Sequence, residues 1–281
     1  MLQRLTEKLA ALAAVDPLAS KLGALARGVF SPQPVKDLLG GSRLGHPLHP
    51  MLTDVTIGTY TSALLLDWLG GRDSRPAAQR LIGLGLLSVT PTVAAGAHDW
   101  SDAEVSDEAV RRIGLVHAAC NVAANTLFAA SWAARRHGGD GRLLALAGGA
   151  ALGAGGYLGG HLAFAEGIGV DHTAFDDEDG DWTDVLAADA LRNNVPQRVH
   201  ADGTAVMVVR HTGDVYALSD HCAHLGGPLH EGKVGDCTIT CPWHESVFDL
   251  RDGALVHGPA AYPQPAWDVR TRAGRIEVRR R

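Results

Sequence analysis

The sequence predicts a protein of two domains, an amino-terminal all-α four-helix membrane bundle and a carboxy-terminal all-β domain. Residues 1–165 contain long uncharged stretches, whereas residues 166–281 contain short β-type runs separated by glycine and proline. The 281 residues are 46% hydrophobic, which is too apolar for a chain that is disordered throughout. The formal net charge is −6 with no concentrated basic surface, so we expect no nucleic-acid partner.

Charge divides the chain in the same way. Residues 1–165 carry 14 basic and 12 acidic side chains, and residues 166–281 carry 11 basic and 19 acidic ones. The stretch 166–189 holds nine acidic residues and no basic one, which is typical of a solvated linker or loop. We therefore divide the chain into an amphipathic helical segment (1–35), a four-span membrane domain (36–165), an acidic linker (166–181) and a β domain (182–281).

Four stretches of the first part are candidate membrane helices. Residues 113–134 and 143–165 are uncharged over 22 and 23 residues, and each could cross about 30 Å of hydrocarbon as a helix. Residues 81–97 are uncharged over 17 residues and contain Pro91, which predicts a kink. Residues 52–69 are the weakest candidate, because Asp54 and Asp67 leave only 12 uncharged residues between them.

Small residues are frequent in these stretches. Glycines four apart occur at 149/153, 155/159 and 156/160, a spacing that lets membrane helices approach closely. A soluble helical bundle rich in alanine and glycine is the competing interpretation.

Residues 1–30 alternate leucine and alanine with charged side chains and are interrupted at Pro17. This pattern predicts one or two amphipathic helices that lie on membrane lipid or pack on the bundle. The stretch lacks the apolar core of a cleavable signal peptide.

From about residue 182 the sequence changes to short β runs bounded by turns. Residues 205–210 and 215–218 flank His211-Thr-Gly-Asp214, which is a hairpin pattern. Further strands are expected at 238–240, 246–248 and 275–278.

Two loops of this domain carry metal-ligand residues, Cys222-Ala-His224 and Cys241-Pro-Trp-His244, separated by 16 residues. Two such loops can hold a binuclear iron–sulfur cluster in which one iron takes two cysteines and the other takes two histidines. Zinc bound by two cysteines and two histidines is the competing interpretation, although the spacing differs from that of the usual zinc finger.

The loops and their surroundings resemble the Rieske 2Fe–2S domain in its ferredoxin-like form. The resemblance runs along Ser219-Asp-His-Cys-Ala-His-Leu-Gly-Gly-Pro-Leu229 and Cys241-Pro-Trp-His-Glu-Ser-Val-Phe-Asp249. It continues through Gly258-Pro-Ala260 and Pro263, which match the proline loop that covers the cluster.

This resemblance implies one 2Fe–2S cluster near the surface of the β domain. Cys222 and Cys241 would bind the buried iron, and His224 and His244 would bind the outer iron. The residues that it places around the cluster are Leu225, Gly226, Ser246, Gly258 and Pro259.

Some positions depart from the Rieske proteins that oxidise quinol. Gly227 and Trp243 stand where those proteins have two further cysteines, so their disulfide cannot form here. Ser246 matches a serine that hydrogen-bonds the cluster, but Phe248 replaces a tyrosine. Because hydrogen bonds to cluster sulfurs raise the reduction potential, we expect a potential below that class. Glu245 adds a negative charge that acts in the same direction.

The resemblance implies a membrane-anchored electron carrier rather than a stand-alone oxygenase, which would need a separate catalytic iron domain. We expect single electrons to pass between a reductase or quinol pool and an acceptor, with redox proteins or a quinone as partners. Two alternatives stay open. One is a catalytic membrane oxidoreductase that the cluster feeds, and the other is a non-catalytic redox sensor.

Three motifs mark the amino-terminal domain: Gly45-His-Pro-Leu-His-Pro-Met51, His117 with Asn121, and Gly159-Gly-His-Leu162. They resemble an uncharacterised four-span membrane family that is found alone or fused to Rieske domains. The resemblance covers about residues 35–170 and implies no activity.

Five histidines are expected at one depth of the membrane, because successive spans alternate in direction. Such a group could bind a b-type haem or another metal, or hold a quinone head group. A polar layer at the membrane interface is the alternative. The five are His46, His49, His98, His117 and His161.

Loop charge and cluster chemistry favour opposite sides of the membrane. The loops on the membrane side opposite the β domain carry six arginines. Because cytoplasmic loops are rich in basic residues, this count favours an external β domain. Export of a folded cluster protein needs a twin-arginine signal, and none appears near the amino terminus. We therefore expect an integral protein of the bacterial cell membrane with its β domain on the cytoplasmic face.

Overall fold

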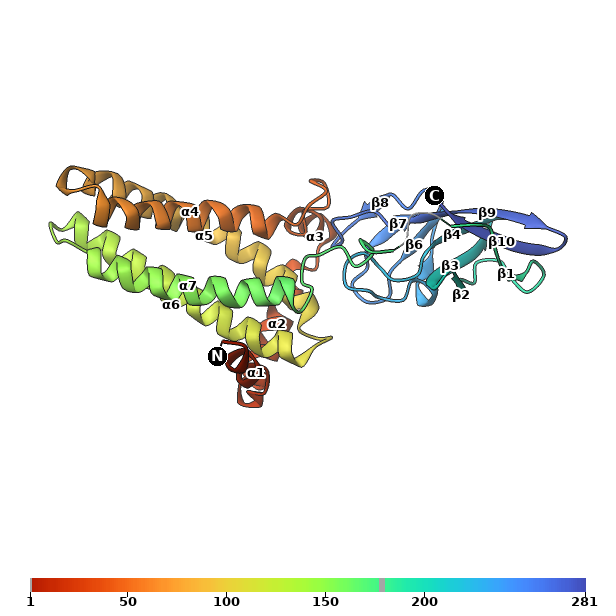
Figure 1. The fold of residues 1–281 in the computed structure, drawn as a ribbon, viewed down its shortest axis with the longest axis horizontal. Coiled ribbons are helices and arrows are strands. Elements are labelled where there is room, and N and C mark those ends of the chain that lie inside the picture. The colour runs from red at the N-terminus through yellow and green to blue at the C-terminus, as the bar shows by residue number, and fades with distance from the viewer. Residues whose placement is uncertain (1, 177–179) are drawn as a thin grey trace. The chain divides into compact units, whose positions relative to one another are not determined.

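The computed structural model describes residues 2–176 and 180–281 and divides into two compact units (Figure 1). The helical unit comprises the chain up to Ser31 together with Leu48–Ile168, and the β unit comprises Pro32–Pro47 together with Gly169–Arg281. The expected helical amino-terminal part and all-β carboxy-terminal domain are confirmed. Residues 177–179 of the expected acidic linker lie outside the described residues.

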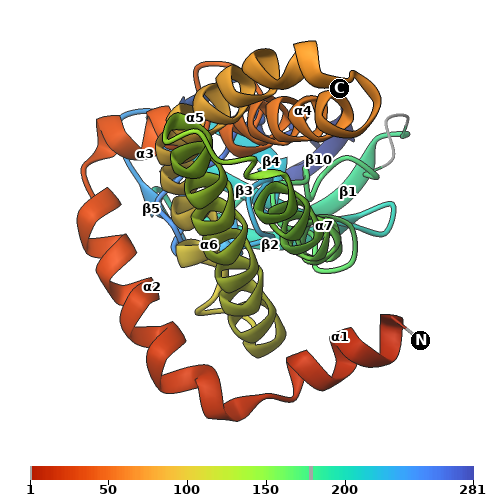
Figure 2. The ribbon, with the colours of Figure 1, turned by 90° about the vertical axis from the view of Figure 1, so that its left-hand side faces the viewer.

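Four long helices form the core of the helical unit (Figure 2). Each packs against the next along the chain, and the last packs against the first, which closes a bundle. Pro91 lies inside the second of them. The helices are α4 (Leu48–Leu69), α5 (Arg75–Ala103), α6 (Glu108–Arg136) and α7 (Arg142–Phe164).

Length and composition separate α4 from the other three helices. Among the described residues, α5, α6 and α7 are long and apolar enough to cross a membrane, and α4 is not among the helices that pass. A bent pair of helices at the amino terminus would be a fourth candidate if counted as one span. A count of four spans that includes α4 therefore stays a prediction.

One of the carboxylates that weakened the first span is neutralised inside the bundle. Asp67 of α4 is fully buried and receives two hydrogen bonds, of 2.8 and 2.5 Å, from the guanidinium of Arg135 on α6. A buried charge is tolerated when it is paired and hydrogen-bonded in this way. The pair therefore lets α4 pack in the bundle despite its charge.

Small residues let the helices approach closely around two stacked rings. The rings of Tyr60 on α4 and Phe128 on α6 lie 3.8 Å apart and nearly parallel, and both are fully buried. A Cβ at Gly85 would lie 2.4 Å from the Tyr60 ring, so no larger residue fits there without movement.

The glycine pairs of α7 differ in how closely neighbouring side chains approach them. A Cβ at Gly155 would lie 2.9 Å from Asn121 on α6, and one at Gly159 would lie 3.0 Å from the ring of His117. Gly153 and Gly156 have nothing within 4 Å of the same position. The 155/159 pair therefore makes the close contact between α6 and α7.

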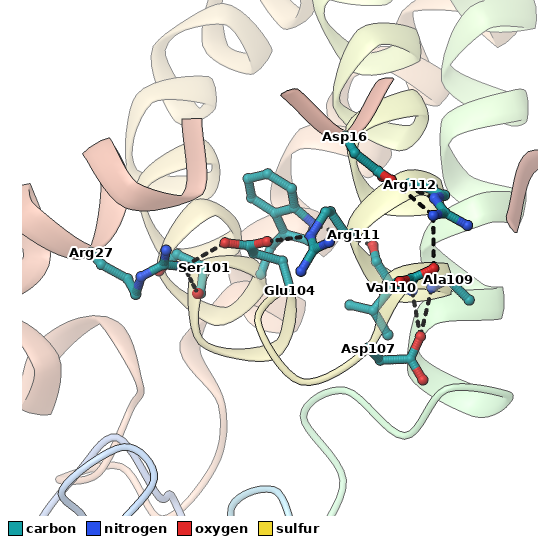
Figure 3. A network of polar contacts seen from close by, with 11 residues as sticks. Asp16, Arg27, Ser101, Glu104, Asp107, Ala109, Val110, Arg111 and Arg112 are labelled. Carbon is teal, nitrogen blue, oxygen red and sulfur yellow. Dashed lines mark hydrogen bonds and ion pairs between the residues drawn. The ribbon is translucent and has the colours of Figure 1, made fainter. Parts of the chain in front are cut away.

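The amino-terminal segment forms α1 (Leu2–Ala10) and α2 (Asp16–Phe30), as expected for amphipathic helices. Figure 3 shows how α2 is attached to the turn between α5 and α6. Glu104, 1% exposed, accepts hydrogen bonds from Arg27 (2.6 Å) and Arg111 (2.8 Å). Arg112 donates two further bonds to Asp16 (2.9 and 2.8 Å).

The outward face of α2 carries exposed apolar side chains at helical spacing. Leu18, Leu22, Leu25 and Val29 are each more than 40% exposed. This stripe is what a helix at a membrane interface presents to lipid.

Two antiparallel sheets build the β unit. The larger has the strand order β1-β10-β9-β4-β3-β2, and the smaller has the order β5-β6-β7-β8. The strands are β1 (Thr183–Ala187), β2 (Gln197–Ala201), β3 (Thr204–His211), β4 (Asp214–Ser219), β5 (Lys233–Val234), β6 (Thr238–Thr240), β7 (Val247–Asp249), β8 (Leu255–His257), β9 (Ala266–Arg272) and β10 (Arg275–Arg280).

Alternation along β3 separates two hydrophobic cores. Val206 and Val208 face the core of the larger sheet, whereas Met207 and Val209 face a core shared with the smaller sheet. This follows from the two-residue period of a strand. The expected hairpin joins β3 to β4, and both Thr212 and Gly213 at its turn have positive φ angles, of 52° and 98°. Two positive φ angles in succession suit the twist of a tight hairpin.

The short helix α3 (Gln33–Leu39) belongs to the β unit, together with the rest of Pro32–Pro47. The sequence grouped most of this segment with the membrane domain because it is adjacent to the first apolar stretch. Long-range hydrogen bonds account for its place in the β unit, since Gln33 and Ser42 donate to residues 257–260 and Asp37 accepts from them.

Candidate iron–sulfur site

Two loops of the β unit bring the four expected ligand side chains together. The loop after β4 carries Cys222 and His224, and the loop after β6 carries Cys241 and His244. Both cysteines are buried, and both histidines are half-buried. The imidazole ring centroids lie 5.1 Å apart, and the two thiols share a hydrogen bond. The loops thus place a pair of thiols inside and a pair of imidazoles nearer the surface.

Gly227 shows how closely the two loops approach. A Cβ at this position would lie 2.8 Å from Sγ of Cys241 and 3.1 Å from the ring of Trp243. Because Cβ atoms do not approach sulfur so closely, a larger residue at this position would need one of the two loops to shift.

Backbone N–H groups surround both sulfur atoms. Those of His224 and Leu225 face Cys222, and those of Trp243 and His244 face Cys241. The Cys222 thiol and these N–H groups lower the pKa of Cys241 to about 7. Hydrogen bonding to Cys241 and burial raise the pKa of Cys222. Since the thiolate is the metal-binding form of cysteine, the N–H groups favour ligation at both sulfurs.

The donor set fits a binuclear cluster. Within residues 2–176 and 180–281, no group of three or more His, Cys, Asp or Glu side chains could hold a metal ion by itself. The donors occur as one pair of thiols and one pair of imidazoles, and each iron of a 2Fe–2S cluster of this kind takes two protein ligands. The residues present therefore fit the iron–sulfur interpretation.

The residues expected around the cluster lie on these loops and on the proline loop, residues 257–263. Ser246 is fully buried, and its Oγ accepts a 3.0 Å hydrogen bond from the N–H of Ala260. The N–H of Gly226 donates to the carbonyl of Cys222 (2.8 Å). Leu225 is half-buried beside it. Ser246 thus connects the loop after β6, called the second ligand loop below, to the proline loop.

Glu245 is paired, which the sequence did not indicate. Its carboxylate lies 2.6 Å from Nζ of Lys36, and this bond holds the pKa of Glu245 below its usual range. Glu245 therefore stays charged next to His244, but the positive charge of Lys36 offsets part of its expected effect on the reduction potential.

Gln264 is a site residue that the motifs did not reveal. Its side chain is 1% exposed and makes three hydrogen bonds to backbone groups at the end of β4 and in the loop after it, which carries Cys222 and His224 and is called the first ligand loop below. Oε1 accepts from the N–H of Ala223 (3.0 Å), and Nε2 donates to the carbonyls of Ser219 and His221 (both 2.7 Å). These bonds lie on either side of Cys222 and hold the loop that carries it.

Asp220 lies within the first ligand motif, but the sequence analysis assigned it no role. It is fully buried and accepts bonds from the N–H (2.8 Å) and Nδ1 (3.0 Å) of His230, and also from Arg198. Asp220 therefore ties the start of the first ligand loop to the far end of the same loop.

Comparison with known proteins agrees with this geometry. Residues 181–268 match the family of the Rieske [2Fe-2S] domain. Ferredoxin CarAc of Metapseudomonas resinovorans is 31% identical over 98 residues, which are 34% of this chain and 92% of that protein. The chain belongs to the Rieske [2Fe-2S] family.

Other Rieske ferredoxins are similar as well. The anthranilate 1,2-dioxygenase ferredoxin subunit of Burkholderia cepacia is 30% identical over 35% of this chain and 91% of its own length. The solved ferredoxin of carbazole 1,9a-dioxygenase from Nocardioides aromaticivorans is 36% identical, with a TM-score of 0.34, over 35% of this chain and 97% of that one. Each of these two similarities covers about a third of this chain.

A second family accounts for the helical part. Residues 45–172 match a predicted membrane protein family, DUF2231. The two resemblances expected from the sequence, a Rieske domain and an uncharacterised membrane domain in one chain, are both confirmed.

The five histidines expected at one membrane depth lie in two units. His46 belongs to the β unit, where its ring lies 6.1 Å from that of Tyr262. A haem, metal or quinone site formed by the group stays a prediction. The ring nitrogens of the other four each approach an oxygen: His49 lies 3.0 Å from Thr92 O, His98 lies 3.2 Å from Asp99, His117 lies 2.8 Å from Gly155 O, and His161 lies 3.1 Å from Glu166.

Proposed function

We propose that this chain is a membrane-anchored electron carrier in which the Rieske cluster passes single electrons between a reductase or quinol pool and a separate acceptor. The observation that carries the proposal is the pairing of two buried thiols with two half-buried imidazoles on adjoining loops. The similar proteins named as ferredoxins support a carrier role. The apolar helices α5, α6 and α7 support an anchor.

A 2Fe–2S cluster, when bound, supplies a one-electron couple at this site. The chain's own residues hold it and control its surroundings. Cys222 and Cys241 lie in the hydrophobic core, which excludes water from the inner side. His224 and His244 are half-buried, so an acceptor can approach their rings. Trp243, 49% exposed, lies beside His244 with ring centroids 6.3 Å apart and offers an apolar contact for such a partner.

The proposal is tested on the full chain in liposomes. We expect two irons and two sulfides per chain, and a reversible one-electron change in the visible circular dichroism. Duroquinol and a ferredoxin reductase with NADH are the two reductants to compare. A chain purified with zinc in place of iron, or a cluster that neither reductant reduces, would contradict the proposal.

Substitution in the helical unit separates a carrier from a catalytic oxidoreductase. An anchor keeps its rate of cluster reduction when His117 or His161 becomes alanine. Loss of that rate in both variants, with the cluster still present, would instead support the catalytic alternative with a site among these histidines.

We further propose that the Rieske domain faces the cytoplasm of a bacterial cell, since iron–sulfur clusters are inserted there. Protease added to sealed right-side-out vesicles should then leave the Rieske domain intact. Cleavage in those vesicles, with protection in inverted ones, would place it on the outside.

A further inference from the structure

The segment Pro32–Pro47, which links α2 to α4, packs on the proline loop within the β unit. Asp37 of α3 is 7% exposed, and its Oδ1 accepts a 2.8 Å hydrogen bond from the N–H of Gly258. Gln33 donates to the carbonyl of Gly258 (3.0 Å) and to Asp37 (2.9 Å). Both polar groups of the Gly258 backbone are therefore bonded by α3.

Asp37 is suited to this role as a carboxylate. Burial acts to raise its pKa, but hydrogen bonds from Gln33 and Gly258, together with His257 at 3.2 Å, outweigh it and hold the pKa below the usual range. A charged acceptor makes a stronger bond to a backbone N–H than a neutral one does.

The contact continues beyond α3. Oγ of Ser42 donates to the carbonyl of Ala260 (2.8 Å). A Cβ at Gly40 would lie 2.7 Å from the carbonyl oxygen of Pro259, and one at Gly258 would lie 2.1 Å from Oγ of Ser42. The two segments are thus so close that neither glycine can carry a side chain unless a neighbouring atom moves.

Two further contacts extend the packed surface. Lys36 pairs with Glu245 in the second ligand loop, at 2.6 Å. The ring of His46 lies 6.1 Å from that of Tyr262, almost perpendicular to it. Since Ala260 also donates to Ser246, a continuous set of bonds runs from α3 through the proline loop to the second ligand loop.

We propose that residues 33–46 are a built-in clamp of the Rieske domain, which holds the proline loop in place over the cluster loops and occupies that face of the domain. Asp37 is the positioning residue of the clamp, and Ser42 and Lys36 extend it. The complete cluster-bearing domain is then made from two separate parts of the chain. The inference does not depend on which partner donates or accepts electrons.

Hydrogen–deuterium exchange on the full, cluster-loaded chain tests the clamp. Asp37→Ala removes the acceptor for the Gly258 N–H, so we expect exchange at the two amides of residues 258–260, those of Gly258 and Ala260, to become at least about tenfold faster. Asp37→Asn keeps a side-chain oxygen acceptor and should retain most of the protection. Asp252→Ala, which removes an exposed acceptor for Ala254 in the same unit, is the matched control and should leave residues 258–260 unchanged.

Two milder changes guard against a variant that fails to fold. Ser42→Ala alone should accelerate exchange at Ala260 and its neighbours by a smaller factor. Lys36→Glu should loosen the second ligand loop, and the added change Glu245→Lys should restore it. Unchanged exchange at residues 258–260 in both Asp37→Ala and Ser42→Ala would overturn the clamp, even if the chain carries electrons as proposed.

Discussion

At the scale of single residues, backbone groups are arranged around the expected ligand side chains. Two successive N–H groups face the sulfur of Cys222, while the N–H of Ala223 between Cys222 and His224 is taken by Gln264. This arrangement orients the loop so that the N–H groups of His224 and Leu225 are directed at sulfur. The buried side-chain amide of Gln264 thereby influences the surroundings of Cys222 through the backbone of the loop.

Replacing Gln264 should weaken the hold on the cluster. Gln264→Leu leaves the Ala223 N–H and the carbonyls of Ser219 and His221 without their partner, at about 1–3 kcal/mol for each buried group left unsatisfied. We expect the cluster to bleach several-fold faster in a chelator, followed by visible circular dichroism. Gln197→Leu, which removes a Gln side-chain bond at an exposed site, is the control. Equal bleaching rates in the two variants would show that Gln264 has no such role.

Ser246 should set part of the reduction potential. Its hydroxyl accepts from Ala260 and can still donate its own proton, and a bond donated to a cluster sulfur raises the potential. Ser246→Ala should therefore lower the midpoint potential in protein-film voltammetry. The equally buried Ser219, which accepts from Trp267, supplies the control variant Ser219→Ala.

The unmodified protein provides a related check. We expect its potential to lie below the upper end, about +300 mV, of the Rieske range. A value at that upper end would contradict the inference drawn from Phe248.

At the scale of helices and strands, small residues and paired charges explain how the chain packs. The ion pair between Arg135 and the buried Asp67 removes the objection that a carboxylate raises against α4 as a bundle helix. Gly155 and Gly159 provide the flat surface on which α6 lies, whereas Gly153 and Gly156 face open space. Glycines with the same four-residue spacing therefore differ in whether a neighbouring helix packs against them.

The glycines of α7 allow a matched test. Gly155→Ala would put a Cβ 2.9 Å from Asn121, and overpacking of this kind costs about 1–3 kcal/mol. We expect a lower midpoint of thermal unfolding in detergent for Gly155→Ala, and no loss for Gly153→Ala. If both variants unfold at the same temperature, the close contact between α6 and α7 is not as described.

At the scale of the whole molecule, the two cores of the β unit should respond differently to loss of iron. Cys222 and Cys241 belong to the core that the smaller sheet shares with one face of β3, and the other core contains neither. Chelation after reduction should accelerate amide exchange in β6 and β7 while β2 and β3 stay protected. Uniform protection of all four strands after iron removal would contradict this expectation.

Much of the fold and of the site could be predicted from local sequence. Uncharged stretches predicted α5, α6 and α7, and alternation with turn residues predicted β3 and β4. The four expected ligands could be named from the sequence because their spacing within each loop is short and the residue types are chemically specific. Asp37 and Gln264 were not, since a single carboxylate or amide carries no periodicity and no motif.

Composition and short residue spacings were enough to predict a helical membrane-type part, a Rieske domain and one set of cluster ligands, because the chain encodes those features locally. The folded chain was needed to show that residues 32–47 belong with the β unit, that Gln264 bonds the loop of Cys222, and that Asp67 is neutralised by Arg135. The cause is the same in all three cases. Hydrogen-bond partners that lie 41 to 221 residues apart in the sequence meet only when the chain has folded. Their bonds therefore cannot be predicted from local sequence patterns.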